Sequence, residues 1–100
     1  MIRATTPTHT FTFPMEYVGH LSKILITYSQ NDKILLNKTQ DDGTWEGNRF
    51  FITLTQEETN LFDSSVFGKV QVRAMTDQNI ALATFIDEFV VNDVLNDEVL

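Results

Sequence analysis

The stretch LSKILITYSQNDKILLNKT, residues 21–39, decides the fold class of this chain. Apolar and polar side chains alternate in two runs around a short polar group, Gln30-Asn31-Asp32. The first run places Ile24, Ile26 and Tyr28 on one face, and the second places Ile34 and Leu36 on one face with Leu35 opposite. A period of two is typical of strands with one buried face, and Asn and Asp tolerate turn dihedrals. The stretch therefore predicts an antiparallel β-hairpin.

Shorter segments with the same period lie on both sides of this hairpin. We expect strands at residues 10–13, 44–46, 49–55, 69–75 and 80–91, separated by turns. The last segment slips in phase near Thr84-Phe85, where a β-bulge would re-aim the side chains. About seven short strands at this spacing predict an all-β fold, an antiparallel β-sandwich of immunoglobulin-like or jelly-roll-like type. The order of the strands stays open.

One helix-start signal interrupts the strand pattern. Thr55-Gln56-Glu57-Glu58 matches a capping box, in which the Thr55 hydroxyl and the Glu58 carboxylate satisfy free backbone N–H groups. We expect one short helix over residues 56–62 that bridges the two layers, with Leu61 and Phe62 tucked under the sheets.

The inward faces of these elements predict the hydrophobic core. Its expected members are Phe11, Phe13, Ile24, Ile26, Phe50, Ile52, Leu54, Phe62, Val70 and Val72. The chain of 100 residues contains no Cys, so neither disulfides nor thiolate metal sites contribute. We expect one domain, residues 1–100, held together by packing alone.

Charge and hydropathy restrict the classes of partner. The formal net charge is −7, and five acids without any Lys or Arg lie between Asp87 and Leu100. Nucleic acid repels such a surface, which acts either as a solvated tail or in docking to a basic partner. Residues 1–10 lack the apolar run of a secretory signal, and no stretch reaches the ~18 apolar residues of a membrane span. We therefore expect neither nucleic acid nor a membrane as partner.

No group of residues has the spacing of a catalytic or cofactor site. His9 and His20 lack ligand spacing, and Asp41-Asp42-Gly43 with Glu46, the best cation candidate, matches an ordinary turn better than a calcium loop. The Asn37-Lys38-Thr39 sequon is discounted because no signal peptide precedes it. We predict no catalytic, cofactor-binding or metal-binding residue, no cofactor, and a protein that is not an enzyme.

Two aromatic residues in turn-rich stretches, Tyr17 and Trp45, have two interpretations. An exposed aromatic side chain often marks an interface. Either ring can instead cover the open end of the sandwich, and the sequence does not decide between these roles.

Several segments carry a family resemblance: residues 1–9 (MIRATTPTH), 24–30 (ILITYSQ), 54–59 (LTQEET) and 70–74 (VQVRA). In these segments, and in their spacing over nearly the whole chain, the sequence resembles small uncharacterised proteins from the structural gene region of Firmicute phages and prophages. A looser similarity is to the N-terminal β-sandwich of phage baseplate upper proteins. These motifs are structural, so the resemblance transfers no active-site residue.

The resemblance implies a non-enzymatic virion structural or assembly protein of the tail or baseplate region. Its partners would be other phage structural proteins or further copies of itself, met in the bacterial cytoplasm during assembly and in the virion. The alternative is a carbohydrate- or host-surface-binding module in which Trp45 stacks on sugar rings.

Overall fold

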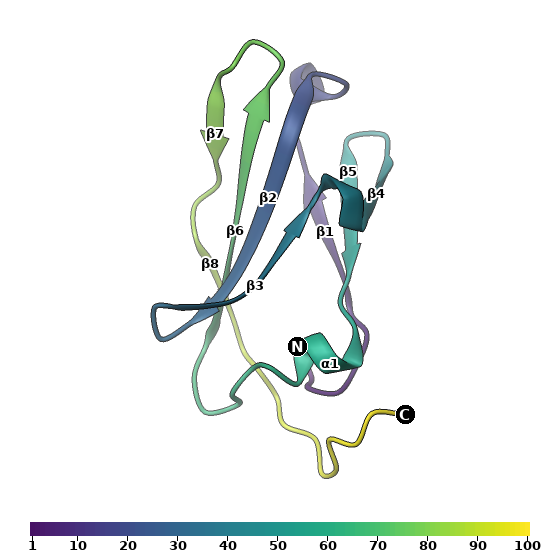
Figure 1. Cartoon of the computed structure of the whole chain (residues 1–100), viewed down its shortest axis with the longest axis vertical. Coiled ribbons are helices and arrows are strands. Elements are labelled where there is room, and N and C mark those ends of the chain that lie inside the picture. The colour runs from purple at the N-terminus through teal and green to yellow at the C-terminus, as the bar shows by residue number, and fades with distance from the viewer.

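The computed structural model describes residues 1–100 as two antiparallel β-sheets with short helical turns between them (Figure 1). The strands are β1 (Thr8–Thr12), β2 (Leu21–Gln30), β3 (Lys33–Thr39), β4 (Gly43–Glu46), β5 (Arg49–Thr53), β6 (Gly68–Thr76), β7 (Ala81–Ala83) and β8 (Asp87–Phe89). The helical elements are α1 (Gln56–Thr59) and two 3-10 turns, η1 (Met15–Tyr17) and η2 (Gln40–Asp42). The predicted all-β sandwich is confirmed.

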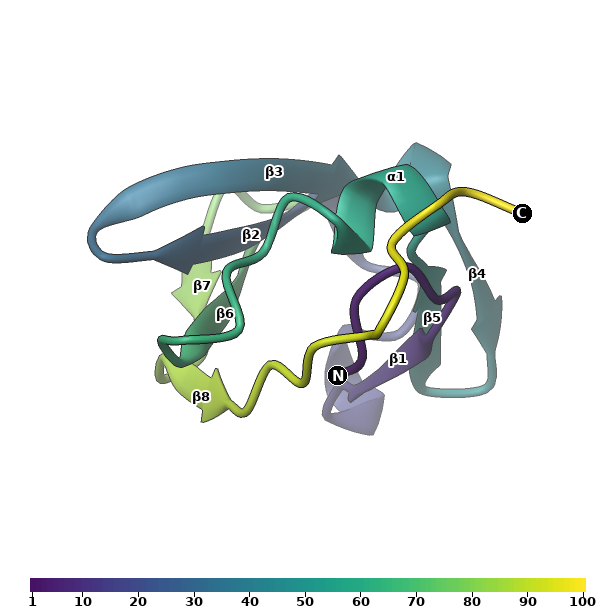
Figure 2. The same ribbon diagram turned by 90° about the horizontal axis from the view of Figure 1, so that it is seen from below.

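The two sheets differ in size. One sheet has three strands in the order β1-β5-β4, and the other has the order β3-β2-β6-β7, with β8 also paired to β6. All strand pairs are antiparallel. Seen from below in Figure 2, β1, β5 and β4 form one layer and β3, β2 and β6 the other, with α1 at this end of the molecule. We call this the α1 end.

The predicted hairpin is confirmed as β2 and β3. Its two turn residues, Asn31 and Asp32, have φ values of 50° and 60°, the left-handed conformation that a tight hairpin turn needs. The prediction that Ile34 and Leu36 share one face is wrong, however. Tyr28 pairs with Leu36 but Ser29 pairs with Ile34, so Leu35 is an extra residue that forms a bulge. The bulge turns Ile34 to the outer face, where it is 61% exposed.

The expected slip near Thr84 is a one-residue bulge at the edge of the larger sheet. Arg73 pairs with Ala83 and Val70 pairs with Asp87, so two residues of β6 face the three residues 84–86. The Thr84 N–H donates to the Val72 carbonyl, and its hydroxyl accepts from the Val72 N–H. The bulge leaves Phe85 94% exposed. It divides one edge into two short strands, β7 and β8.

The core contains most of the predicted residues. Eight of the ten are buried, whereas Phe11 and Val70 are half-buried at its margin. Tyr28 and Val91 complete the buried cluster. Tyr28 belongs to the inward face of β2, but Val91 follows the last strand and enters the core because its segment crosses between the sheets (Figure 2).

The capping box is confirmed by both of its hydrogen bonds. The Glu58 N–H donates to the Thr55 hydroxyl at 3.1 Å, and the Thr55 N–H donates to the Glu58 carboxylate at 2.9 Å. The helix α1 ends at Thr59, earlier than expected, and connects β5 of one sheet to β6 of the other. Phe62 is buried, but Leu61 is 53% exposed, so the prediction that both lie under the sheets is wrong for Leu61.

None of the helices in this structure has the length and apolar character needed to cross a membrane, since α1 has only four residues.

Replacing Phe50 with Ala should lower the free energy of unfolding by about 3–5 kcal/mol, because the ring is fully buried and its loss leaves a cavity. Phe85→Ala is the matched control, since the same atoms are removed from an exposed ring. Urea denaturation followed by tryptophan fluorescence measures both. Equal effects of the two substitutions would contradict the core described above.

Candidate interaction groove

A buried polar contact holds the two sheets at a fixed separation. The Tyr28 hydroxyl of β2 lies 2.6 Å from Nδ1 of His9 on β1. The Tyr28 ring is fully buried and meets Phe62 and Phe89 edge to face, at centroid distances of 6.0 and 6.3 Å. A buried phenol needs a hydrogen-bond partner, and here the partner belongs to the opposite sheet.

The protonation states of this pair follow from burial. Desolvation raises the pKa of the Tyr28 phenol, so the hydroxyl keeps its proton. Desolvation also lowers the pKa of His9, with a smaller contribution from the Met1 ammonium. A neutral imidazole can accept at Nδ1, so we assign the hydrogen bond as donated by the Tyr28 hydroxyl.

At the α1 end, the two chain ends close the space between the sheets. The Met1 carbonyl accepts from the Asn92 N–H at 2.7 Å, and the Arg3 N–H donates to the Asn92 carbonyl at 3.0 Å. Figure 2 shows the segment after β8 running past the N-terminal residues toward α1. Val91, which lies in this crossing, is buried as part of the core cluster.

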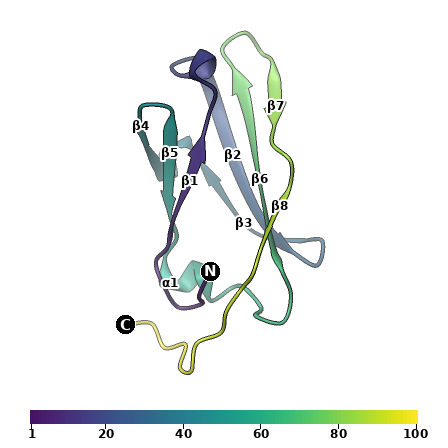
Figure 3. The same ribbon diagram turned by 180° about the vertical axis from the view of Figure 1, so that it is seen from behind.

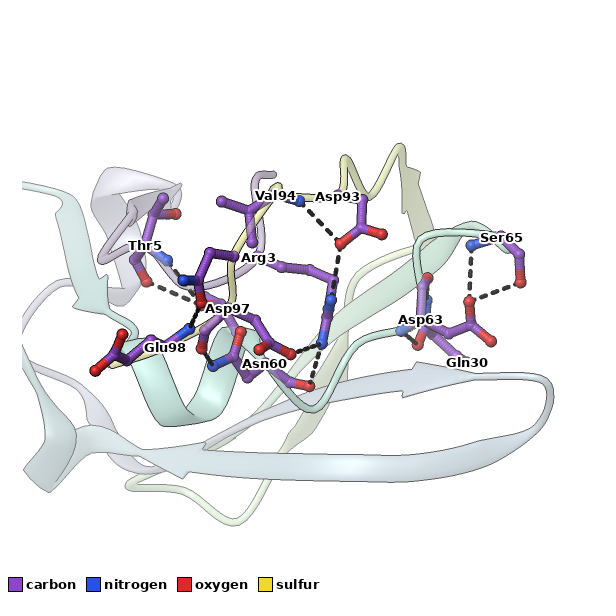
Figure 4. Close-up of polar contacts among 12 residues, drawn as sticks. Arg3, Thr5, Gln30, Asn60, Asp63, Ser65, Asp93, Val94, Asp97 and Glu98 are labelled. Atoms are coloured by element: carbon purple, nitrogen blue, oxygen red, sulfur yellow. Dashed lines mark hydrogen bonds and ion pairs between the residues drawn. The ribbon is translucent and has the colours of Figure 1, made fainter. Parts of the chain in front are cut away.

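The side chain of Arg3 fixes the crossing in place (Figure 4). Its guanidinium donates to the Asp93 carboxylate at 2.8 Å, to the Asn60 carbonyl at 3.3 Å and to the Asp97 carboxylate at 3.4 Å. The Asn60 amide donates to the Asp97 carbonyl at 3.0 Å. The C-terminal segment is therefore attached to both the N-terminal residues and the residue that follows α1.

Away from the α1 end, the sandwich has an open side. A groove of about 450 Å³ separates β1 and η1 from β6, β7 and β8. Figure 3 shows these elements from behind, with β1 on the left and β6 and β7 on the right. The groove is lined by Thr10, Phe11, Thr12, Phe13, Pro14, Tyr17, Val72, Ala74, Leu82, Ala83, Thr84 and Asp87.

The strand β1 borders this groove with unpaired backbone groups. Its only strand partner is β5. The Leu54 N–H donates to the Pro7 carbonyl and the Phe13 N–H to the Asn48 carbonyl, so the odd-numbered residues of β1 face β5. Because hydrogen-bonding positions alternate along an antiparallel strand, the N–H and C=O groups of Thr10 and Thr12 point away from β5.

The opposite border has the same property. The Thr76 N–H donates to the Ile80 carbonyl and the Thr84 N–H to the Val72 carbonyl, which places the even-numbered residues of β7 toward β6. The backbone groups of Ala83 therefore point away from β6, at the edge of the larger sheet. Two sheet edges with free donors and acceptors border one groove.

The groove has the chemistry of a peptide-binding site. Its lining is mainly apolar, with Phe13 and Val72 from the core and small side chains at Ala74 and Ala83. Edge strands with free backbone groups accept an additional strand, and apolar pockets beside them select alternate side chains of that strand. The Asp87 carboxylate is the one charged group in the lining. The groove can therefore hold an extended segment that carries a basic residue.

The structure separates the residues that the sequence proposed as polar sites. His9 is hydrogen-bonded to Tyr28. The His20 ring lies 3.1 Å from the carboxylate of Asp77, which is in the turn between β6 and β7. Asp42, the last residue of η2, accepts from the Thr39 N–H at 2.8 Å and so completes a capping box with Thr39. No three His, Asp or Glu side chains converge as a metal site would require.

The sequon and Trp45 also have structural explanations. The Asn37 side chain accepts from the Thr27 hydroxyl at 2.7 Å across the β2–β3 pair. Trp45 is 41% exposed, with ring centroids 5.1 Å from Phe13 and 5.0 Å from Phe50. Of its two interpretations, the covering of the core is the one that these contacts support. Tyr17 lies in the groove lining.

Most of the groove was missed from the sequence. Phe11 and Thr12 were expected in a strand, but nothing local indicated that β1 pairs with β5 and leaves its other edge free. Comparison of the chain with family models, curated proteins and solved structures finds no match.

The stability of the protein should fall as the pH is lowered through the range just below about 6.5, the ordinary pKa of His. Since burial lowers the folded-state pKa of His9, the unfolded chain binds the proton more tightly, and acid favours unfolding. Melting temperatures measured between about pH 7 and pH 5 should depend less on pH in His9→Gln than in the wild type. The hydrogen bond from Arg3 lowers the pKa of Asp93. Protonation of such carboxylates affects stability only below about pH 4, outside this range.

Calcium should not raise the melting temperature, because a ligand stabilises only a protein that binds it in the native state. Asp42→Ala should cost about 1 kcal/mol through loss of the cap to Thr39, whereas Asp41→Ala, whose carboxylate makes no such bond, should cost less. Thermal unfolding with and without calcium tests both. A calcium-dependent increase that Asp41→Asn with Asp42→Asn abolishes would instead establish a cation site in this turn.

Proposed function

We propose that this chain is a non-enzymatic structural or assembly protein of a phage or prophage particle, from the tail or baseplate region. It acts through protein–protein contacts. The observation that carries the proposal is the groove between β1 and β7, where two sheet edges with free backbone groups border a mainly apolar space.

The groove favours a macromolecular partner. Backbone donors and acceptors repeat along an edge with the spacing of another extended chain, so a peptide segment satisfies several of them at once. A small ligand would leave part of the edge unpaired. The free groups of Thr10, Thr12 and Ala83 therefore support binding of a strand from a partner protein.

The phage setting is supported by the sequence resemblance. The segments that carry it include residues 24–30 and 70–74, which belong to β2 and β6, and residues 54–59, which contain the capping box. These elements build the scaffold on which the groove depends. The proposal thus joins a resemblance in the scaffold to an interaction site at its open side.

A carbohydrate-binding module is the alternative function, and it depended on Trp45. The contacts of this ring with Phe13 and Phe50 account for its position without a sugar. A glycan array in which Trp45→Ala removes a binding signal would return this alternative to first place.

Thr10→Pro should reduce incorporation of the protein into particles by at least about tenfold, because proline removes an N–H that faces the groove. Thr8→Pro is the matched control: its N–H lies on the same edge but outside the groove lining. Quantitative mass spectrometry of purified particles, or of particles released after prophage induction, measures the protein. Circular dichroism confirms that both variants fold.

Two results would contradict the proposal. One is the absence of the wild-type protein from particles and from assembly intermediates. The other is equal incorporation of Thr10→Pro and wild type, which would show that the groove takes no part in assembly.

A further inference from the structure

The outer face of the five-stranded sheet differs in charge from the rest of this acidic protein. Ile24 and Ile26 point into the core, so the odd-numbered residues of β2 point outward. The odd-numbered residues of β6, which pair with them, point outward as well. This places Lys23, Lys69 and Arg73, three of the seven basic residues, on one face, and Glu88 opposite Lys69 is the acid paired there.

A shallow hollow of about 180 Å³ lies on this face. The apolar side chains that point outward into it are Leu25, Met75 and Ala81, while Ala74 and Leu82, which also line the groove, form its floor. Its two charged groups are the cations Lys23 and Arg73. Such a hollow fits a single aliphatic side chain that has acidic neighbours. We call it the basic hollow.

The α1 end has the complementary chemistry. Asp93 and Asp97 pair with Arg3 there (Figure 4), yet their side chains stay 59% and 62% exposed, so both carboxylates can still meet a partner. Glu98 follows Asp97, and Glu57 lies on α1. Within the C-terminal segment, Leu95 lies between Asp93 and Asp97 in the chain, and its side chain is fully exposed. We call residues 93–98 the acidic tip.

We propose that the acidic tip of one copy binds the basic hollow of a second copy, with Leu95 inserted between Lys23 and Arg73. This inference deepens the proposed function and rests on it for the setting in which copies meet. Each copy has both surfaces, on different parts of the molecule. The contact is therefore head-to-tail, which produces rings if the rotation closes and filaments if it does not.

Charge complementarity is what identifies a second copy as the occupant. Unlike charges speed the encounter of two surfaces and select their orientation, while burial of an exposed aliphatic side chain adds affinity. In a single copy, the Leu95 side chain is fully exposed. The lining of the basic hollow contains two cations and no acidic residue. One contact resolves both.

Sedimentation velocity over a range of protein concentrations tests the contact directly. The wild type should associate at about 50 mM salt and dissociate at about 500 mM, where charge pairs are screened. Leu95→Asp, and separately Lys23→Glu with Arg73→Glu, should each weaken association by at least about tenfold. The matched controls are Leu100→Asp, also fully exposed, and Arg49→Glu, on the other sheet. Both controls should associate like the wild type.

A mixing experiment tests the head-to-tail geometry. The Leu95→Asp protein keeps an intact hollow, and the Lys23→Glu, Arg73→Glu protein keeps an intact tip. An equimolar mixture should form a dimer and nothing larger, although each variant alone stays monomeric. A mixture that stays monomeric, or a Leu95→Asp variant that assembles like the wild type, would overturn the proposal.

The outcome separates this inference from the proposed function. One result is that the wild-type protein is monomeric at all concentrations but present in particles, while Thr10→Pro is absent from them. This result overturns the contact between copies and leaves the groove function standing. Salt-sensitive self-association with absence from particles supports the contact between copies and overturns the groove function.

Discussion

The hydrogen bond between Tyr28 and His9 is the constraint on which the rest of the structure depends. It is a polar contact made by a fully buried ring of the core, and it joins an inner strand of the larger sheet to an edge strand of the smaller one. A misplaced β1 would leave a buried phenol without a partner, which costs more than the bond itself contributes. The bond therefore specifies where β1 lies relative to β2, in addition to any stability it adds.

The position of β1 in turn determines the groove. Because β1 is held against β5 on one side and by His9 from within, its other edge stays exposed at a fixed distance from β6 and β7. The crossing of residues 1–3 and 90–92 closes the space at the α1 end, and the side between β1 and β7 stays open as the groove. A site formed in this way is part of the rigid scaffold, and a partner strand would meet edges that are already in place.

Features encoded by neighbouring residues could be predicted from the sequence. The β2–β3 hairpin, the capping box at Thr55 and the phase slip at Thr84 all follow from short patterns. The shared face of Ile34 and Leu36 was predicted wrongly because the bulge at Leu35 has no local signal. Strand order depends on pairings between distant residues, such as Phe11 with Phe50, and no local pattern specifies them. The groove was missed for that reason, since it exists only where two distant edges fail to meet.

The bulge at residues 84–86 sets a length scale for recognition. An uninterrupted strand paired to β6 would present a long free edge with which many other strands could form hydrogen bonds. Here β7 contributes three residues before the chain departs from the ladder, and Phe85 projects at the point of departure. A strand that enters the groove along this edge runs out of partners after a few residues. A partner strand of the kind proposed would therefore have to be short along this edge, and an interrupted edge is also a poorer template for uncontrolled strand pairing.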